Sequence, residues 1–164
     1  AFARTLTSAF NPALRRTSIS EALVYGAGMI DANGFSGLRR VIDVSGDGPN
    51  NQGRPVTEAR DAVLAQGIVI NGLPLMTREG MGSQWHLEQL DIYYQTCVIG
   101  GPGAFVIPVL DWEDFAEAVR RKLIQEMAAG PPNRVVPVQM IERDPTDCMI
   151  GEKIWRERRR YWEP

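Results

Sequence analysis

The chain has 164 residues, of which 44% are hydrophobic and 23% charged, and its net charge is −2. These proportions are typical of one globular domain with a real core, and the small net charge gives no general reason to expect nucleic acid or an anionic membrane as a partner. No apolar run approaches the ~20 residues of a membrane span, and no signal-peptide pattern is present. Because Ala1 begins a stretch typical of a helix interior, we expect a mature, cleaved or incomplete chain whose upstream part is missing.

The first predicted helix runs from about residue 18 to residue 30. Ser18 and Glu21 have the three-residue spacing of a capping box, which opens a helix by satisfying its first amide groups. The residues that follow leave little polar surface, so we expect this helix to be well buried. Asn33 and Gly34 supply a natural end for it.

A strand, a helix and a second strand follow in close succession. Residues 41–45 are mostly β-branched and break abruptly into Gly, Asp and Pro, which indicates a buried strand that ends in a loop. Residues 55–66 predict a helix that begins near Pro55 and is capped by Gly67, and residues 68–73 predict the next strand. A unit of this length favours a parallel pair with a right-handed crossover.

The next part of the chain is more irregular. Residues 76–86 are polar and rich in Gly, which predicts an exposed loop that could shape a binding surface, and residues 87–96 predict a short helix. Residues 104–109 predict a third strand, in which Pro108 fits a strand end or edge because it has no amide donor.

A further helix is predicted to begin at Asp111, with Asp111 as its cap and acidic residues in its first turn. Apolar residues at helical spacing give it one buried face, and Arg120, Arg121 and Lys122 belong to the opposite, solvated face. The helix ends at Gly130.

We divide the chain into a domain at residues 1–130 and a C-terminal extension at residues 131–164. Within the extension, residues 135–138 predict an edge strand and residues 151–162 a short basic helix. This helix carries aromatic residues at helical spacing: Trp155, Tyr161 and Trp162. They either dock the helix on the domain or form an arm that grips another chain, because aromatic and Arg side chains are enriched at interfaces.

Asp47 is the first candidate for chemistry. It follows directly on the first predicted strand, and ligands of open α/β sheets bind outside the carboxyl ends of the strands. The glycines on either side of it allow the backbone to approach a ligand closely. Thr17 precedes the first predicted helix. From these residues alone, the favoured interpretation is structural: Asp47 closes a turn and Thr17 caps a helix.

Other candidate sites have less support. His86 is the only histidine, and with Glu88 and Asp91 nearby it fits solvated residues better than a metal site, which usually needs three protein ligands. The Gly-rich stretches lack the Lys-Ser/Thr of a P-loop and the third glycine of a dinucleotide-binding fingerprint, and no serine lies in a nucleophile elbow. Cys97 and Cys148 fit a disulfide or two buried thiols equally well.

Two stretches resemble parts of a von Willebrand factor A domain. They are residues 16–20 (RTSIS) and residues 41–48 (VIDVSGDG). Domains of that family hold a divalent ion in a metal-ion-dependent adhesion site built from an Asp-x-Ser-x-Ser element, a Thr and an Asp. The resemblance implies that Thr17 and Asp47 are metal ligands for Mg²⁺, or for Mn²⁺ or Ca²⁺. The Asp-x-Ser-x-Ser element has no counterpart here and is expected upstream of Ala1.

The chain is similar, more closely still, to a bacterial secreted subfamily of these domains known only as a domain of unknown function. The matching stretches are residues 41–51 (VIDVSGDGPNN), 70–74 (INGLP), 97–105 (CVIGGPGAF) and 111–116 (DWEDFA). The resemblance covers roughly residues 2–128, the later part of the family's domain. It implies a periplasmic or secreted protein, and it raises the expectation of a disulfide between Cys97 and Cys148 over that of free thiols.

We therefore expect an α/β fold of three layers, with a mostly parallel central sheet as in the von Willebrand factor A domain and with the N-terminal part missing. A parallel sheet cut in half leaves edges unpaired, so upstream residues or another chain should complete it. The first functional hypothesis is a non-enzymatic, cation-dependent protein-binding module. The alternative is a structural subunit of a larger assembly with an incomplete metal site. A hydrolase that uses Asp47 is a third hypothesis, without a supporting base.

Overall fold

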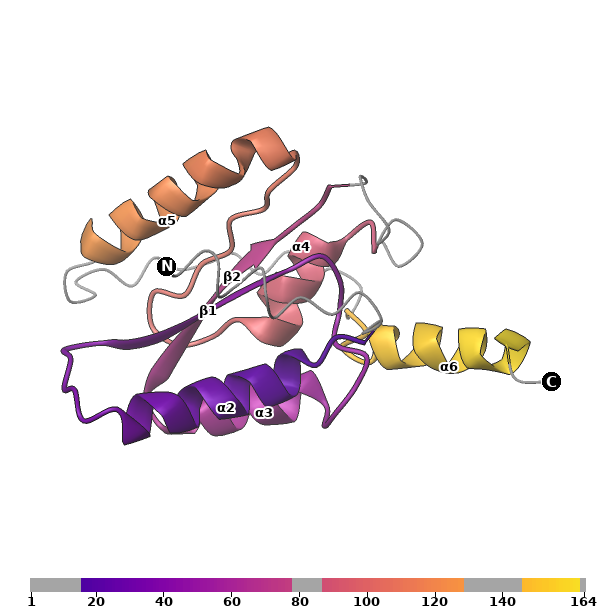
Figure 1. Cartoon of the computed structure of the whole chain (residues 1–164), viewed down its shortest axis with the longest axis horizontal. Helices are drawn as coiled ribbons and strands as arrows, with labels where there is room; N and C mark the ends of the chain where they lie inside the picture. Colours follow the sequence, from indigo (N-terminus) through magenta and orange to yellow (C-terminus); the bar gives the residue numbers. More distant parts are fainter. Residues whose placement is uncertain (1–15, 78–86, 129–145, 163–164) are drawn as a thin grey trace, which may run out of the picture.

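A computed structural model describes residues 16–77, 87–128 and 146–162 of the chain (Figure 1). The predicted edge strand at residues 135–138 and most of the predicted loop at residues 76–86, with His86, lie outside the described residues. The elements in chain order are α2 (Ile19–Ala32), β1 (Arg40–Gly46), α3 (Val56–Ala65), β2 (Ile68–Pro74), α4 (Leu90–Tyr93), the π-helical turn η2 (Tyr94–Val98), the 3-10 turn η3 (Trp112–Asp114), α5 (Phe115–Ala128) and α6 (Ile150–Trp162).

The strand–helix–strand prediction is confirmed. β1 and β2 form a parallel pair, with Arg40 opposite Ile68 at one end and Gly46 opposite Pro74 at the other, and α3 connects them. Every residue of β2 is buried, whereas β1 is only partly buried. Gly67 ends the turn after α3 with a positive φ of 72°, the left-handed conformation that glycine tolerates best.

The predicted third strand forms only in part. Residues 105–109 run beside β2: the amide of Ile107 donates to the Gly72 carbonyl, and the amide of Val109 donates to the Pro74 carbonyl. The pairing is reduced to isolated parallel bridges at Val106 and Val109. Pro108 contributes no amide donor, which interrupts a continuous ladder at this position.

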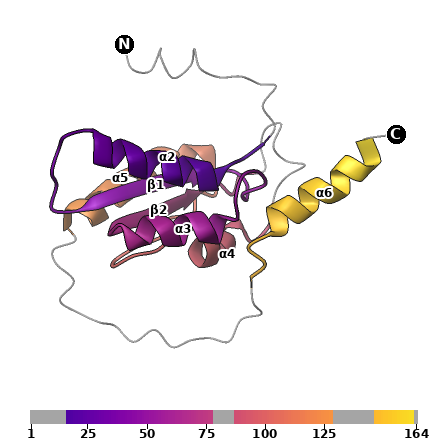
Figure 2. The same cartoon turned by 90° about the horizontal axis from the view of Figure 1, so that it is seen from below.

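Helices lie on both sides of the sheet, which makes the described part an α/β arrangement (Figures 1 and 2). The side covered by α2, α3 and α4 holds the larger core, where Leu23, Val63 and Ile70 are among the fully buried side chains. The side covered by α5 holds a smaller cluster that includes Leu73 and Val109. Parallel sheets are usually covered on both faces in this way.

The capping prediction for α2 is confirmed, but its predicted burial is wrong. The Ser18 hydroxyl accepts a hydrogen bond from the Glu21 amide at 3.3 Å, which is one half of a capping box, and the Glu21 carboxylate pairs with Arg54 instead of returning to Ser18. Only one face of α2 packs on the core, because Tyr25 is 71% exposed and Met29 is 52% exposed. Because the sequence of α2 has no distinct polar face, it did not indicate which side of the helix would pack on the sheet.

The start of α5 also differs from the prediction. Asp111 makes no side-chain cap bond, and the chain enters α5 through the 3-10 turn η3. Lys122 was expected on the solvated face, but its ammonium lies 2.5 Å from the Asp43 carboxylate of β1. The Asn71 amide of β2 also donates to Asp43, at 3.4 Å. The Lys122 side chain is only 11% exposed, so its ammonium needs the Asp43 carboxylate to offset its lost hydration.

Candidate functional site

The loop after β1 is joined directly to the segment that precedes α2. The Thr17 amide donates to the Asn51 side-chain oxygen at 2.8 Å, and the Asn51 amide donates to the Thr17 carbonyl at 2.9 Å. Asp47 lies in the same loop, four residues before Asn51, and is exposed, whereas Thr17 is partly buried. The structure therefore brings the two predicted ligand segments together at the carboxyl end of β1.

Two serines of the α2 N-terminus strengthen this connection. The hydroxyl of Ser18 donates to the Gln52 carbonyl at 3.0 Å, and that of Ser20 approaches the same oxygen at 3.4 Å. Gly53 follows with a φ of 87°, and a Cβ atom there would lie 2.8 Å from the Ser18 hydroxyl oxygen. The loop can approach the helix end this closely only because residue 53 is glycine.

The described residues fit part of a hard-cation site rather than a whole one. Asp47 offers a carboxylate and Thr17 a hydroxyl, which are oxygen ligands of the kind that Mg²⁺ accepts together with several waters. Within the described part of the chain, no three His, Cys, Asp or Glu side chains form a group that could hold a metal ion. Any cation bound here would therefore need further ligands beyond those the described residues bring.

Asn50 connects this loop to three other elements, a role that the sequence did not reveal. Its side-chain oxygen accepts from the Ser20 amide at 3.0 Å, and its side-chain amide donates to the Arg54 carbonyl at 3.3 Å and to the Glu152 carboxylate at 2.7 Å. Its backbone amide donates to the Tyr93 hydroxyl at 3.2 Å. Asn50 is fully buried. In the sequence it is one of several turn-forming residues after a proline, and no local signal marks it as buried.

Two adjacent tyrosines, Tyr93 and Tyr94, contact the loop that follows β1. The Tyr93 hydroxyl lies 3.5 Å from the Cys148 carbonyl, as a donor to it. A Cβ atom on Gly46 would lie 2.7 Å from the Tyr94 hydroxyl, so the ring closes the space beneath the end of β1. The Tyr94 hydroxyl is buried without a hydrogen-bond partner among the described residues. Burial raises the pKa of both hydroxyls well above the ordinary value of 10.0.

These raised pKa values predict a loss of stability in alkali. Because the folded pKa exceeds the unfolded one, the contribution of each tyrosine is fully present below pH 10 and is lost as the pH rises above it. In a spectrophotometric titration, Tyr93 and Tyr94 should ionise only as the circular dichroism of the folded state disappears. Ionisation of all four tyrosines with the fold intact would contradict this expectation.

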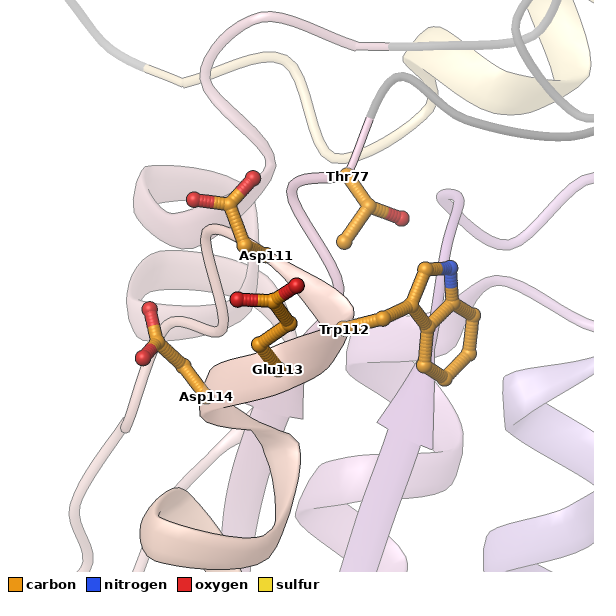
Figure 3. Close-up of a pocket in the computed structure, with 5 residues that line it drawn as sticks. All are labelled: Thr77, Asp111, Trp112, Glu113 and Asp114. Atoms are coloured by element: carbon orange, nitrogen blue, oxygen red, sulfur yellow. The ribbon is translucent and has the colours of Figure 1, made fainter.

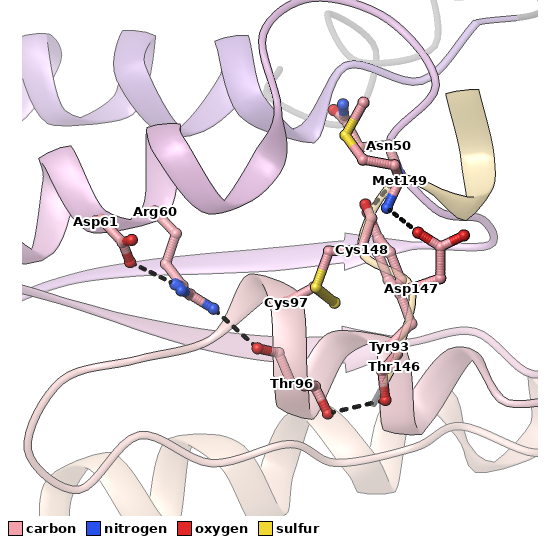
Figure 4. The surroundings of a disulfide bond; sticks show 10 residues. All are labelled: Asn50, Arg60, Asp61, Tyr93, Thr96, Cys97, Thr146, Asp147, Cys148 and Met149. Atoms are coloured by element: carbon pink, nitrogen blue, oxygen red, sulfur yellow. Dashed lines mark hydrogen bonds and ion pairs between the residues drawn. A yellow bond between two sulfur atoms is a disulfide. The ribbon is translucent and has the colours of Figure 1, made fainter. Parts of the chain in front are cut away.

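The predicted disulfide is present. Cys97, fully buried in η2, is bonded to Cys148, and Figure 4 shows the contacts around the bond. The Arg60 guanidinium donates to the Thr96 carbonyl at 2.8 Å, and the hydroxyls of Thr96 and Thr146 lie 3.5 Å apart. The bond therefore fixes the start of the C-terminal segment to the helical layer beside β2.

The three aromatic residues predicted to bind a partner all belong to α6. Trp155 lies beneath the Arg16 guanidinium, 4.8 Å from the ring centre, so this side chain contacts its own chain. The side chains of Tyr161 and Trp162 lie outside the described part. Among the described residues, no helix combines the length and apolar composition needed to cross a membrane.

A pocket lies at the entrance to α5, where the chain leaves the carboxyl ends of β2 and of the segment at residues 105–109, the same edge of the sheet at which the Asp47 loop follows β1. Its volume is about 270 Å³, and it is lined by Thr77, Asp111, Trp112, Glu113 and Asp114 (Figure 3). Three of these five side chains are acidic and no basic side chain lines the pocket. The sequence assigned residues 111–114 to a helix start and Thr77 to the loop at residues 76–86 that was expected to shape a binding surface, and it did not predict that the two meet.

The comparisons with known proteins identify a family without an assigned activity. A family model described as "Protein of unknown function (DUF1194)" matches residues 1–131, which is more than half of the chain. No curated protein and no solved structure matches the chain.

Proposed function

We propose, from its geometry, that this chain, which belongs to the DUF1194 family of proteins of unknown function, is a non-enzymatic, divalent-cation-dependent protein-binding module. The proposal assigns Thr17 and Asp47 to a cation site of the adhesion type of the von Willebrand factor A domain. The ion would be Mg²⁺, or Mn²⁺ or Ca²⁺ in its place. Such an ion supplies an open coordination position for an acidic group on the partner protein.

The connection between the Thr17 segment and the Asp47 loop carries this proposal. The reciprocal bonds of Thr17 with Asn51 hold a hydroxyl-bearing residue beside a carboxylate-bearing loop at the carboxyl end of a parallel strand. That is the end at which open α/β sheets bind ligands. The exposure of Asp47 leaves its carboxylate accessible to an ion and to a partner.

The sheet supports a further part of the proposal, namely that β1 is completed by another strand. β1 has only one strand neighbour among the described residues, yet it carries the β-branched residues Val41, Ile42 and Val44. Natural edge strands are usually shielded by charges, proline or bulges. We propose that the upstream part of the domain or another chain pairs with the free edge of β1 and adds the remaining cation ligands.

The disulfide supports the proposed location. Structural disulfides persist in oxidising compartments such as the bacterial periplasm or the extracellular space, and the Cys97–Cys148 bond ties together residues 51 positions apart. We therefore propose a periplasmic or secreted protein. If the cation site is incomplete, the alternative is a structural subunit of a larger assembly, which the unpaired edge of β1 would favour.

Thermal unfolding in Mg²⁺ and in EDTA tests the cation site. An ion at ~100 times its dissociation constant adds about 2.7 kcal/mol to the free energy of unfolding, which corresponds to a rise of roughly 5–10 °C for a domain of this size. The Asp47→Ala variant should lose this rise. Asp61→Ala serves as the control, because Asp61 is also an exposed acid, on α3, where its partner is Arg60.

The outcomes separate the two functions. A rise that is present in the wild type and in Asp61→Ala but absent in Asp47→Ala supports the cation-dependent module. The same unfolding temperature in Mg²⁺ and EDTA for all three proteins would overturn it and leave the structural subunit as the better description.

A further inference from the structure

The ring of Tyr94 lies across both strands of the sheet, at a glycine in each. A Cβ atom on Gly72 of β2 would lie 2.8 Å from a carbon of the ring, and one on Gly46, the last residue of β1, would lie 2.7 Å from the hydroxyl oxygen. Glycine weakens a strand because it has no side chain to pack, and it often marks a place where another group approaches the backbone closely. The two glycines therefore make room for one ring, which brings its hydroxyl to the end of β1.

The Tyr94 hydroxyl lies on the side of the sheet that α2 covers. Ile42 of β1 packs against the larger core, which contains Tyr94 and one side of α2. Because alternate residues of a strand face the same side, Gly46 faces this core too. The segment before α2 is joined to the loop after Gly46 through the bonds of Thr17. The hydroxyl is therefore buried at the end of β1, on the side from which the Thr17 segment approaches the Asp47 loop.

This hydroxyl has no hydrogen-bond partner within the part of the chain that the structure describes. A buried donor without an acceptor costs the protein its desolvation, and a phenylalanine ring would fill the same space without that cost. The neighbouring Tyr93 differs, because its hydroxyl accepts a hydrogen bond from the Asn50 amide. Packing of the ring thus leaves the Tyr94 hydroxyl unexplained, and buried polar groups of this kind often serve a bound ion or a functional site.

Asp47 is the acceptor that this position suggests. It follows Gly46 directly in the chain and is exposed. Burial raises the pKa of the Tyr94 hydroxyl most, and the charges of Tyr93 and Asp47 raise it further. The hydroxyl therefore keeps its proton at neutral pH and can donate it in a hydrogen bond. Carboxylates that bind metal ions are commonly held in place by such a donor.

We propose that Tyr94 is a positioning residue of the cation site, whose hydroxyl donates to the Asp47 carboxylate and orients it toward the ion. This inference rests on the cation-dependent module proposed above. Thr17 and Asp47 contact the ion, and Tyr94 acts on it only through Asp47. The bond fixes a carboxylate that is otherwise exposed, and it gives the buried hydroxyl the acceptor that the described residues do not supply.

Deletion of the hydroxyl in Tyr94→Phe separates this role from packing. The affinity for Mn²⁺, measured from the paramagnetic resonance signal of the free ion, should fall roughly tenfold, as on loss of other donors to metal ligands. The unfolding temperature in EDTA should stay the same or rise, because the variant lacks a buried hydroxyl without a partner. Tyr25→Phe is the matched control. It deletes the same atom from an exposed side chain of α2 and should change neither quantity.

A spectroscopic measurement reports on the hydroxyl itself. In protein labelled with ¹³C at the Cζ atoms of tyrosine, added Mg²⁺ should shift the Tyr94 resonance, which is identified by its absence from Tyr94→Phe. The Tyr25 resonance should stay in place. In Asp47→Ala, which lacks the acceptor, Mg²⁺ should leave the Tyr94 resonance unchanged, and a full shift in this variant would contradict the proposed bond.

The results distinguish failure of this inference from failure of the cation site. If the wild type and Tyr94→Phe bind Mn²⁺ equally well, the positioning role is overturned and the cation site stands. Weaker binding by Tyr94→Phe together with a lower unfolding temperature in EDTA would also overturn that role, because damage to the fold would then explain the loss. If the wild type binds no Mn²⁺, the cation site itself is overturned, and the role of Tyr94 with it.

Discussion

Removing the disulfide with Cys97→Ser/Cys148→Ser is expected to lower the free energy of unfolding by up to ~4 kcal/mol. The bond closes a loop across a sequence separation of 51 residues, and the chain-entropy model gives about this value for a loop of that length. The corresponding fall in unfolding temperature is roughly 8–16 °C for a domain of this size. Urea unfolding of the wild type and the double variant, followed by circular dichroism, measures the difference.

Reduction provides a matched control for the serine substitutions. The reduced wild type should unfold close to the double variant, because both have lost the cross-link, and a reductant should leave the double variant unchanged. Equal stability of the oxidised and reduced wild type would show that the bond does not constrain the unfolded chain, and would contradict the account of how α6 is fixed.

Replacing Asn50 should have the second large effect, with Asn50→Ala costing about 3–5 kcal/mol. The substitution removes the donor to the partly buried Glu152 carboxylate and the acceptor of the Ser20 amide. Groups left buried without a partner cost their full desolvation, and a charged one costs most. Asn33→Ala is the control, because Asn33 makes an exposed bond to the Phe35 amide and should cost under ~1 kcal/mol.

The contact with Glu152 can be isolated by a reciprocal exchange. Asn50→Asp keeps the shape and the acceptor for Ser20 but places a carboxylate against the Glu152 carboxylate. Asn50→Asp/Glu152→Gln restores one donor and one acceptor with their positions exchanged. The double variant should therefore be more stable than Asn50→Asp alone, and strictly additive costs would contradict a direct contact.

The sequence predicted those parts of the fold that depend on local signals. The Ser18 cap and the Gly67 turn were predicted correctly because each is fixed by residues within one helical turn. The order and direction of β1 and β2 followed from the length of the connection between them. The third strand was predicted as continuous because its β-branched residues outweighed the single proline, whereas pairing depends on each amide donor.

Contacts between distant elements could not be predicted in the same way. Lys122 turns inward because Asp43 lies beneath it, and the two residues are 79 positions apart in the sequence. Asn50 meets Glu152 from the far end of the chain, and neither residue has a local pattern that indicates burial. The presence of two cysteines, Cys97 and Cys148, fitted a disulfide and two free thiols equally well. The bond was expected only through the family resemblance.

Direct binding of Mn²⁺ to the purified protein tests the central proposal. The paramagnetic resonance signal of free Mn²⁺ falls as the ion binds, so the affinity is measured without reference to stability. The proposal expects saturable binding that Asp47→Asn and Thr17→Val each weaken by at least roughly tenfold, a common cost of losing one contact of this strength, and that Asp61→Asn leaves unchanged. Binding of Mn²⁺ with equal affinity by the wild type, Asp47→Asn and Thr17→Val would contradict the assignment of this loop as a cation site.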